Sequence, residues 1–136
     1  MTNGQKSSKA LHITIWVVQI VLAASFIWAA GMKLFSPVSQ LAAMWPWVAE
    51  VPGSLVKFTG VIDLLGAIGL ILPSVLRIRP KLTPIAALAV IVLMVCASIF
   101  HITRGETSVI GANLVFGIMA AFVAWGRFSK APIRPK

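Results

Sequence analysis

The sequence FTGVIDLLGAIGLILP occupies positions 58–73 and contains a single ionisable side chain, Asp63. It belongs to an apolar run over 55–72, about the length that a helix needs to cross the hydrocarbon of a membrane. A carboxylate in such a run is expensive to bury, so it marks either a functional site or an ion pair that fixes helix packing. The stretch therefore predicts a membrane-spanning helix over 55–72 that ends near Pro73, with Asp63 close to the middle of the bilayer.

The composition extends this interpretation to the whole chain of 136 residues. Hydrophobic residues make up 59% of it and charged residues only 11%, whereas soluble domains are about half apolar and a quarter charged. Three further apolar runs cover 11–34, 84–101 and 108–125. We therefore predict an all-α fold, an integral membrane four-helix bundle with short loops over residues 11–127, which leaves no room for a separate catalytic domain.

The remaining segments are polar or rich in helix-breaking residues. Residues 1–10 are predicted to form a disordered N-terminus, and residues 128–136 a basic tail. Between the first two helices, residues 35–54 contain Pro37, Pro46 and Pro52, so this stretch is not a span. Its tryptophans, Trp45 and Trp47, are typical of a membrane interface. We expect an interfacial segment or short surface helix there.

The positive charge gives the orientation. A formal charge of +9 is common in nucleic-acid-binding proteins, but here the basic residues lie in short flanks between apolar runs, which argues against that class. Three Lys/Arg residues flank one side of the predicted bundle, and the other nine flank the side of both chain ends (Lys6, Lys9, Arg77, Arg79, Lys81, Arg127, Lys130, Arg134 and Lys136). The positive-inside rule therefore predicts that both termini are cytoplasmic.

Each predicted helix carries one stripe of polar and small side chains, which should face the interior of the bundle. Because the helices alternate in direction, the polar ends of these stripes should meet in a pocket in the outer half of the membrane. The residues expected there are Lys33, Asp63, His101 and Asn113. We take Asp63, His101 and Lys33 as candidate catalytic residues, and Asn113, Thr59 and Ser98 as candidate cofactor-binding residues.

Structural interpretations compete with these assignments. Lys33 and Asp63 can form an ion pair that only fixes helix register, and Asn113 can form an interhelical hydrogen bond. Arg104 and Glu106 are expected to be a solvated loop pair. Lys57 is expected to extend to the outer interface, and Gln19 to join helices in the inner half.

Several chemistries lack a sequence signature. The single cysteine, Cys96, allows no disulfide within the chain and no CxxC pair, and we expect it to be a small packing residue. No spacing of His, Cys, Asp or Glu indicates a metal site, so none is predicted. No glycine-rich phosphate loop or catalytic triad is visible, so the sequence contains no self-contained catalytic motif.

The chain resembles the DoxX-like family of small bacterial four-helix membrane proteins from about Trp28 to Arg127. The residues that carry the resemblance are Gly31-Met32-Lys33, the stretch from Phe58 to Pro73, Leu82-Thr83-Pro84-Ile85-Ala86-Ala87, His101 and Arg104-Gly105-Glu106. The family's acidic position in the second helix is often glutamate, and here it is Asp63, one methylene shorter. The resemblance implies a multi-pass protein of the bacterial inner membrane. Some relatives are linked to quinone-coupled oxidation of sulfur compounds and others to oxidative-stress complexes.

Three functions remain open at this point. The first is a quinone-linked subunit of a membrane oxidoreductase, in which a quinone meets Lys33, Asp63 and His101 and a membrane or periplasmic partner delivers electrons. The second is a small proton-coupled transporter, which would work as a homo-oligomer and use Asp63 as its switch. The third is a non-enzymatic scaffold or assembly protein whose partners dock on Trp45-Pro46-Trp47 or on the basic tail. The lipid bilayer is a partner in all three.

Overall fold

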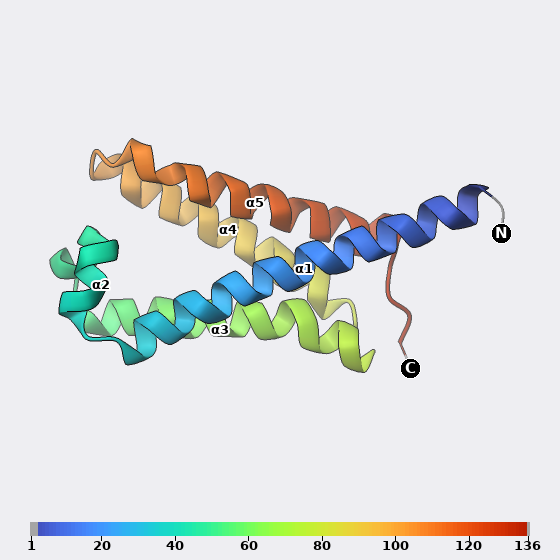
Figure 1. Ribbon diagram of the computed structural model, residues 1–136, viewed down its shortest axis with the longest axis horizontal. Coiled ribbons are helices and arrows are strands. Elements are labelled where there is room, and N and C mark those ends of the chain that lie inside the picture. Colours follow the sequence, from blue (N-terminus) through green and yellow to red (C-terminus); the bar gives the residue numbers. More distant parts are fainter. Residues whose placement is uncertain (1–2, 136) are drawn as a thin grey trace.

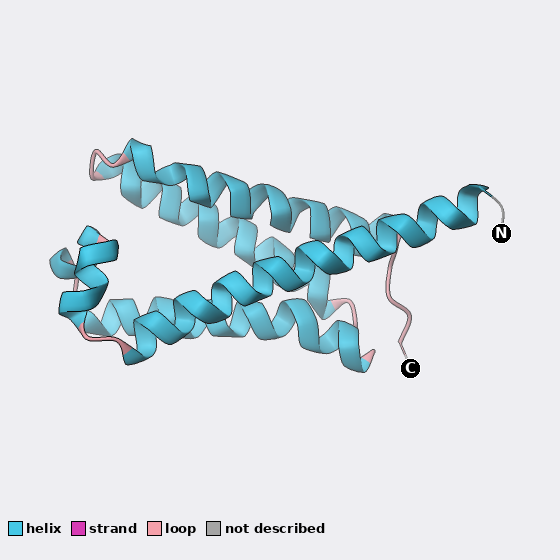
Figure 2. Cartoon of the chain, viewed as in Figure 1, coloured by secondary structure: helices cyan, strands magenta, loops and turns pink. Residues whose placement is uncertain are grey.

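A computed structural model describes residues 3–135 of the chain. Met1, Thr2 and Lys136, which belong to the predicted N-terminal segment and basic tail, lie outside the described residues. The described part consists of helices joined by loops and turns, with no strand among residues 3–135 (Figure 2). Its elements in chain order are α1 (Asn3–Phe35), α2 (Val38–Met44), the 3-10 helix η1 (Pro46–Glu50), α3 (Gly53–Leu76), α4 (Leu82–Thr103), the 3-10 helix η2 (Thr107–Val109), α5 (Ile110–Trp125) and the π-helical turn η3 (Gly126–Lys130).

Four of the helices are long and apolar enough to cross a membrane, and this confirms the predicted four-helix membrane bundle. The candidate spans are Lys9–Phe35, Gly53–Leu76, Leu82–Thr103 and Ile110–Lys130. In the bundle, α1 packs chiefly on α3 and α4 chiefly on α5. The two pairs diverge toward the end that carries α2, and both chain ends lie at the opposite end (Figure 1). Below, the end that carries α2 is called the outer end and the end with the termini the inner end.

The inward stripes predicted for the four helices are the buried ones. Gln19 and Leu70 are fully buried, as are Ala87 and Ala120. Most other large apolar side chains on the spans remain exposed, as expected for helices surrounded by lipid. The core is therefore narrow, and polar side chains form a large part of it.

Two predicted boundaries shift because the helices continue through polar sequence. The structure starts α1 at Asn3, so residues 3–10 are helical rather than disordered; no proline interrupts them. At the other end, η3 continues α5 to Lys130, so residues 128–130 of the predicted tail still belong to the helical part of the chain. The predicted spans 84–101 and 108–125 otherwise lie within two residues of α4 and α5.

The second helix was predicted to end near Pro73, and α3 continues through Pro73 to Leu76, three residues further. Proline has no N–H and therefore frees the carbonyl four residues earlier, that of Gly69. The Thr83 hydroxyl of α4 donates to this carbonyl at 3.1 Å, and the Gln19 amide of α1 donates to the adjacent Leu70 carbonyl at 2.7 Å. Side chains from two neighbouring helices thus donate hydrogen bonds to the backbone carbonyls in the turn before Pro73. Gln19 joins two helices, as predicted.

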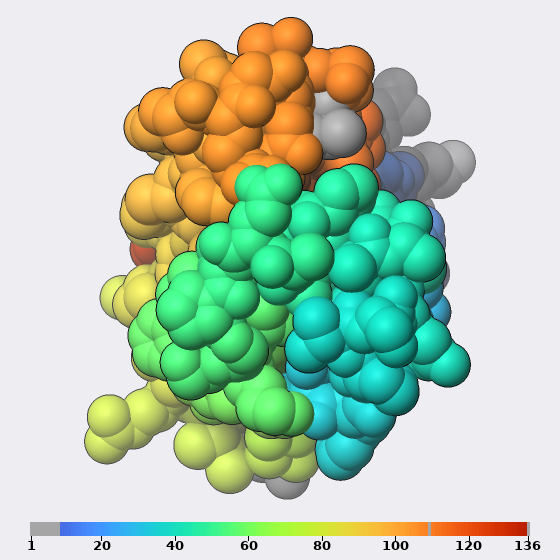
Figure 3. Space-filling view, turned by 90° about the vertical axis from the view of Figure 1, so that its left-hand side faces the viewer, coloured from blue at the N-terminus to red at the C-terminus, as the bar shows by residue number. Residues whose placement is uncertain are grey.

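The predicted interfacial segment is present as α2 and η1, and it covers the outer end of the bundle. A small apolar cluster joins this segment to α3, and its buried members are Leu41 of α2, Val48 of η1 and Val56 of α3. Figure 3 views this end and shows the segment (turquoise to green) in contact with the loop before α5 (orange). The segment therefore forms a cap over the space between the diverging helix pairs, and below it is called the cap.

Candidate functional site

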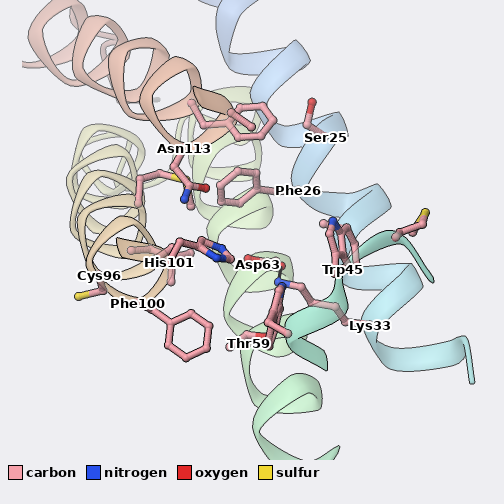
Figure 4. Close-up of a pocket in the computed structure, with 18 of the residues that line it drawn as sticks. Ser25, Phe26, Lys33, Trp45, Thr59, Asp63, Cys96, Phe100, His101 and Asn113 are labelled. Carbon is pink, nitrogen blue, oxygen red and sulfur yellow. Dashed lines mark hydrogen bonds and ion pairs between the residues drawn. The ribbon is translucent and has the colours of Figure 1, made fainter. Parts of the chain in front are cut away.

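A cavity of about 1010 Å³ lies in the outer half of the bundle, bounded by the four spans and the cap. Lys33 of α1, Asp63 of α3, His101 of α4 and Asn113 just inside α5 all line it, together with Thr59. Figure 4 shows Lys33, Asp63, His101 and Asn113 pointing toward this space from four helices. The predicted convergence of the four polar residues is therefore present in the structure.

Lys33 and Asp63 form a close ion pair at the floor of the cavity. Lys33 Nζ lies 2.8 Å from Asp63 Oδ2, and the two side chains are 14% and 7% exposed. Gly60, one turn before Asp63, permits the approach, because a Cβ there would lie only 3.0 Å from Lys33 Cβ. The shorter aspartate therefore still reaches its lysine.

Two tryptophans of the cap complete the surroundings of this lysine. Lys33 Nζ lies 5.8 Å from the ring centroid of Trp45 and 5.9 Å from that of Trp47. At this separation the electron-rich ring faces attract the ammonium group. Trp45 and Trp47 were predicted as interface anchors, or as a docking segment for partners; in the structure they line the cavity.

A chain of ionisable groups leads from the cavity to the outer surface. His101 Nδ1 lies 3.3 Å from Glu106 Oε1, and Arg104 Nε donates to the same oxygen at 2.6 Å. Arg104 also pairs with Glu50 of the cap, whose side chain is 62% exposed. The hydrogen bond from Arg104 lowers the pKa of Glu106, and the bonds to Glu106 and Glu50 raise the pKa of Arg104. Arg104 and Glu106 are thus more than a solvated loop pair, because they join the cap to the α4–α5 connection.

Asn113 lacks the interhelical hydrogen bond that was expected for it. Its side-chain Nδ2 is buried and has no hydrogen-bond partner among the described residues. An unpaired amide N–H away from water costs about 1–3 kcal/mol. Because Asn113 lines the cavity, a ligand that supplies an acceptor atom there would remove this cost.

The cavity opens sideways, toward the lipid. Its lining includes exposed residues on three different spans, Trp28 on α1, Cys96 on α4 and Ala112 on α5, and Trp28 is 56% exposed. These residues lie within the apolar spans rather than in the loops. A ligand can therefore enter from the bilayer between α1 and the α4–α5 pair.

Comparison with known proteins bears on this part of the chain. Residues 17–123 match the model of the DoxX-like family, well over half of the chain. The chain belongs to the DoxX-like family. No match was found among curated proteins or among solved structures. The matched range contains Lys33, Asp63, His101 and Asn113, so the cavity of this DoxX-like chain lies within the part that the family model covers.

Two other candidates contribute less to the site than the sequence suggested. The Thr59 hydroxyl donates to the Val56 carbonyl of its own helix at 2.8 Å, although Thr59 lines the cavity. The Ser98 hydroxyl donates to the Met94 carbonyl at 2.8 Å, and Ser98 does not line the cavity. Cys96 was expected to be a packing residue; it is exposed and is one of the residues that line the cavity.

The sequence analysis missed a second polar cluster of this DoxX-like chain, at the inner end. Arg127 is only 4% exposed; its Nε donates to Gln19 Oε1 at 2.6 Å, and its Nη1 lies 2.9 Å from His12 Nδ1. We had counted Arg127 among the basic residues that flank the bundle, because it follows the apolar run. The signal that could have found it is the 100° periodicity of the fourth helix, since Ala120, Ala124 and Arg127 share one face.

Proposed function

We propose that this DoxX-like membrane protein binds the head group of a lipid-soluble quinone in the outer cavity and acts as a membrane subunit of an oxidoreductase. The observation that carries the proposal is the buried, unpaired Nδ2 of Asn113, a residue that lines a cavity with exposed residues of the spans in its wall. A quinone is apolar except for its ring carbonyls, which only accept hydrogen bonds. It therefore matches a lipid-facing entrance with donors inside.

The cavity offers donors from two helices. The Asn113 amide comes from α5, and the Lys33 ammonium comes from α1. An ammonium group carries three N–H donors, and Asp63 is the one side-chain acceptor that Lys33 has among the described residues. A ring carbonyl can take another of these donors while the ion pair stays intact. Aromatic side chains of the lining, Trp45, Phe100 and Phe116, provide flat apolar surfaces for the ring.

Proton transfer would follow the ionisable groups described above. Reduction of a quinone takes up protons, and oxidation of a quinol releases them, so a site of this kind needs an acid or base near the oxygens. His101 lines the cavity and contacts Glu106, which is 24% exposed. These two residues thus provide a path between the cavity and the outer surface. We assign electron delivery to a partner protein, because the chain contains no sequence motif for a redox cofactor.

The positive-inside count supports a location for this activity. Both chain ends lie at the inner end of the bundle together with most of the Lys and Arg residues. We place this end on the cytoplasmic side of a bacterial inner membrane. The cavity would then face the periplasmic half, and a periplasmic or membrane-bound partner could reach the cap.

The test is quinone binding by the protein purified in mild detergent, measured by absorbance and mass spectrometry. The wild type should retain quinone, or take it up when it is added back. Asn113→Leu, which is close in size but has no donor, should bind at least about tenfold less, the effect of losing a donor worth about 1.4 kcal/mol. Ser98→Ala is the matched control, because Ser98 does not line the cavity, and it should bind as the wild type does. Absence of quinone binding in the wild type, or equal binding in all variants, would refute the proposal.

A proton-coupled carrier is the second candidate, because Asp63 is a membrane-embedded carboxylate only 5% exposed. In sealed vesicles a carrier would dissipate an imposed proton gradient when its substrate is added, and Asp63→Asn would abolish this. A scaffold would instead co-purify with its partner whether or not Asp63 is present. Quinone binding that is lost with Asn113 favours the first proposal over both alternatives.

A further inference from the structure

A second groove lies on the lipid-facing side of the molecule, between α3 and α4 near the inner end. Its volume is about 480 Å³, and its lining is entirely apolar, including Leu72, Leu76, Ile78, Leu82 and Ile85. The floor is formed where the two helices approach most closely. A Cβ at Gly69 would lie 2.8 Å from the Ala86 side chain, so the helices touch there and the larger side chains stand on either side.

The inner end of this groove adjoins a cluster of exposed cations. Ile78, a lining residue, lies between Arg77 and Arg79 in the turn that joins α3 to α4, and Lys81 follows. Arg77, Arg79 and Lys81 are all exposed. Arg77 Nε also donates to the carbonyl of Arg134 at 2.9 Å, which holds the basic tail against this turn.

Among the described residues, no acidic side chain pairs with this cluster. The chain has three acidic residues. Asp63 is paired with Lys33, and Glu50 and Glu106 are both paired with Arg104 at the outer end. The groove therefore combines an apolar channel with a positive rim whose cations pair with no acidic side chain in the described part of the chain.

We propose that this groove binds one anionic phospholipid, with an acyl chain between α3 and α4 and the phosphate against Arg79 and Lys81. Basic pockets next to spanning helices bind such head groups, and the attraction grows with each Lys or Arg near the surface. The groove and the outer cavity share no lining residue. The test of lipid binding is therefore independent of the test of quinone binding.

The charge distribution disfavours a second copy of the chain as the occupant. Copies inserted with the same orientation have their turns at the same depth. A dimer formed through this groove would bring Arg77, Arg79 and Lys81 close to the same cations of its partner, and the acidic residues would lie at the far end of both. Like charges in proximity are destabilising, whereas a phosphate at this depth is attracted.

The experiment is native mass spectrometry of the full-length protein in detergent, with phosphatidylglycerol or phosphatidylcholine added at equal concentration. The wild type should retain one phosphatidylglycerol per chain and much less phosphatidylcholine. The double variant Arg79→Gln with Lys81→Gln should bind phosphatidylglycerol roughly tenfold more weakly or worse, since two charges near the phosphate are removed. Lys9→Gln is the matched control: it also removes an exposed charge at the inner end, but from α1, which extends away from the groove there (Figure 1).

A second variant tests the apolar half of the site. Ala89 is exposed and lines the groove, so Ala89→Trp should fill it without disturbing the core and should displace the lipid while leaving every charge in place. Equal retention of both lipids, or full retention of phosphatidylglycerol in the double variant, would overturn the proposal. A protein dimer that Ala89→Trp dissociates would overturn it in favour of a second copy.

Discussion

Replacement of Asp63 by leucine is the sharpest test of the ion pair at the floor of the outer cavity. The change removes the carboxylate that lies 2.8 Å from Lys33 Nζ and leaves the ammonium group among apolar and aromatic side chains. If the two residues act as a pair, the cost of the first change should largely disappear when Lys33→Leu is added. The quantity of interest is therefore the coupling between the two substitutions rather than either single effect.

The structure indicates the magnitude. Removing one partner of a buried ion pair costs about 3–5 kcal/mol, because the other charge remains buried. Lys33 is 14% exposed and lies within 6 Å of two tryptophan rings, and each ring compensates part of this cost, about 0.5–1 kcal/mol. We expect Asp63→Leu to lower the free energy of unfolding by about 3 kcal/mol, and the double variant to lie within about 1 kcal/mol of the wild type.

The assay is reversible unfolding in mixed micelles with increasing SDS, followed by helix content for the wild type, both single variants and the double variant. Lys57→Leu combined with Asp63→Leu is the matched control. Lys57 is another lysine near the outer end, but it is exposed and donates to the Leu34 carbonyl instead of to Asp63. That combination should recover none of the unfolding free energy that Asp63→Leu loses. Equal costs for Asp63→Leu and for the double variant would show that the pair contributes no coupling, and the reasoning would be wrong.

Three further predictions concern other parts of the fold. Thr83→Val should destabilise the bundle by about 1 kcal/mol in the same assay, because it removes the hydroxyl that donates to the Gly69 carbonyl and also bonds to the Ser74 hydroxyl. Pro73→Ala in that background should recover part of the loss, because it restores a backbone N–H for the Gly69 carbonyl; no recovery would contradict this account of Pro73. Gly69→Ala should cost about 1–3 kcal/mol, since the new Cβ would lie 2.8 Å from a side chain of α4, and an unchanged stability would contradict the close approach. The pKa of Glu106 is lowered in the fold, so its contribution to stability is present above the ordinary glutamate pKa and is lost as the pH falls through the lowered value. Arg104→Gln should therefore flatten the acid dependence of thermal stability between about pH 7 and about pH 3. An unchanged slope of thermal stability against pH would contradict this prediction.

The sequence predicted the spans well because their apolar runs leave few alternatives in a membrane. It also predicted which polar residues meet, since antiparallel helices with one inward stripe each must bring Lys33, Asp63, His101 and Asn113 to similar depths. The length of α3 could not be predicted in this way. A proline ends a helix unless other groups satisfy the freed carbonyl, and here those groups are Thr83 and Gln19, which belong to other helices.

The role of the cap could not be predicted from the sequence either. Composition indicated an interfacial segment with two tryptophans, but not that it folds onto the bundle and places both rings near Lys33. Such contacts depend on the path of a short irregular segment, which has no periodicity to follow. Arg127 was misplaced for a related reason, because an arginine after an apolar run is ordinarily at the interface, and only the partners on α1 show that it is buried.

The sideways opening of the outer cavity has a consequence for how affinity should be measured and interpreted. A ligand that enters between α1 and the α4–α5 pair has already left water, so the hydrophobic free energy of its tail is gained on partitioning into the bilayer and not on binding. Occupancy then depends on the ligand's mole fraction in the lipid, and a longer tail raises that fraction without strengthening the bound contacts. Dissociation constants obtained in detergent will therefore shift with the amount of micelle. Only the head group, through the contacts that it makes inside the cavity, decides which of the molecules dissolved in the membrane is retained.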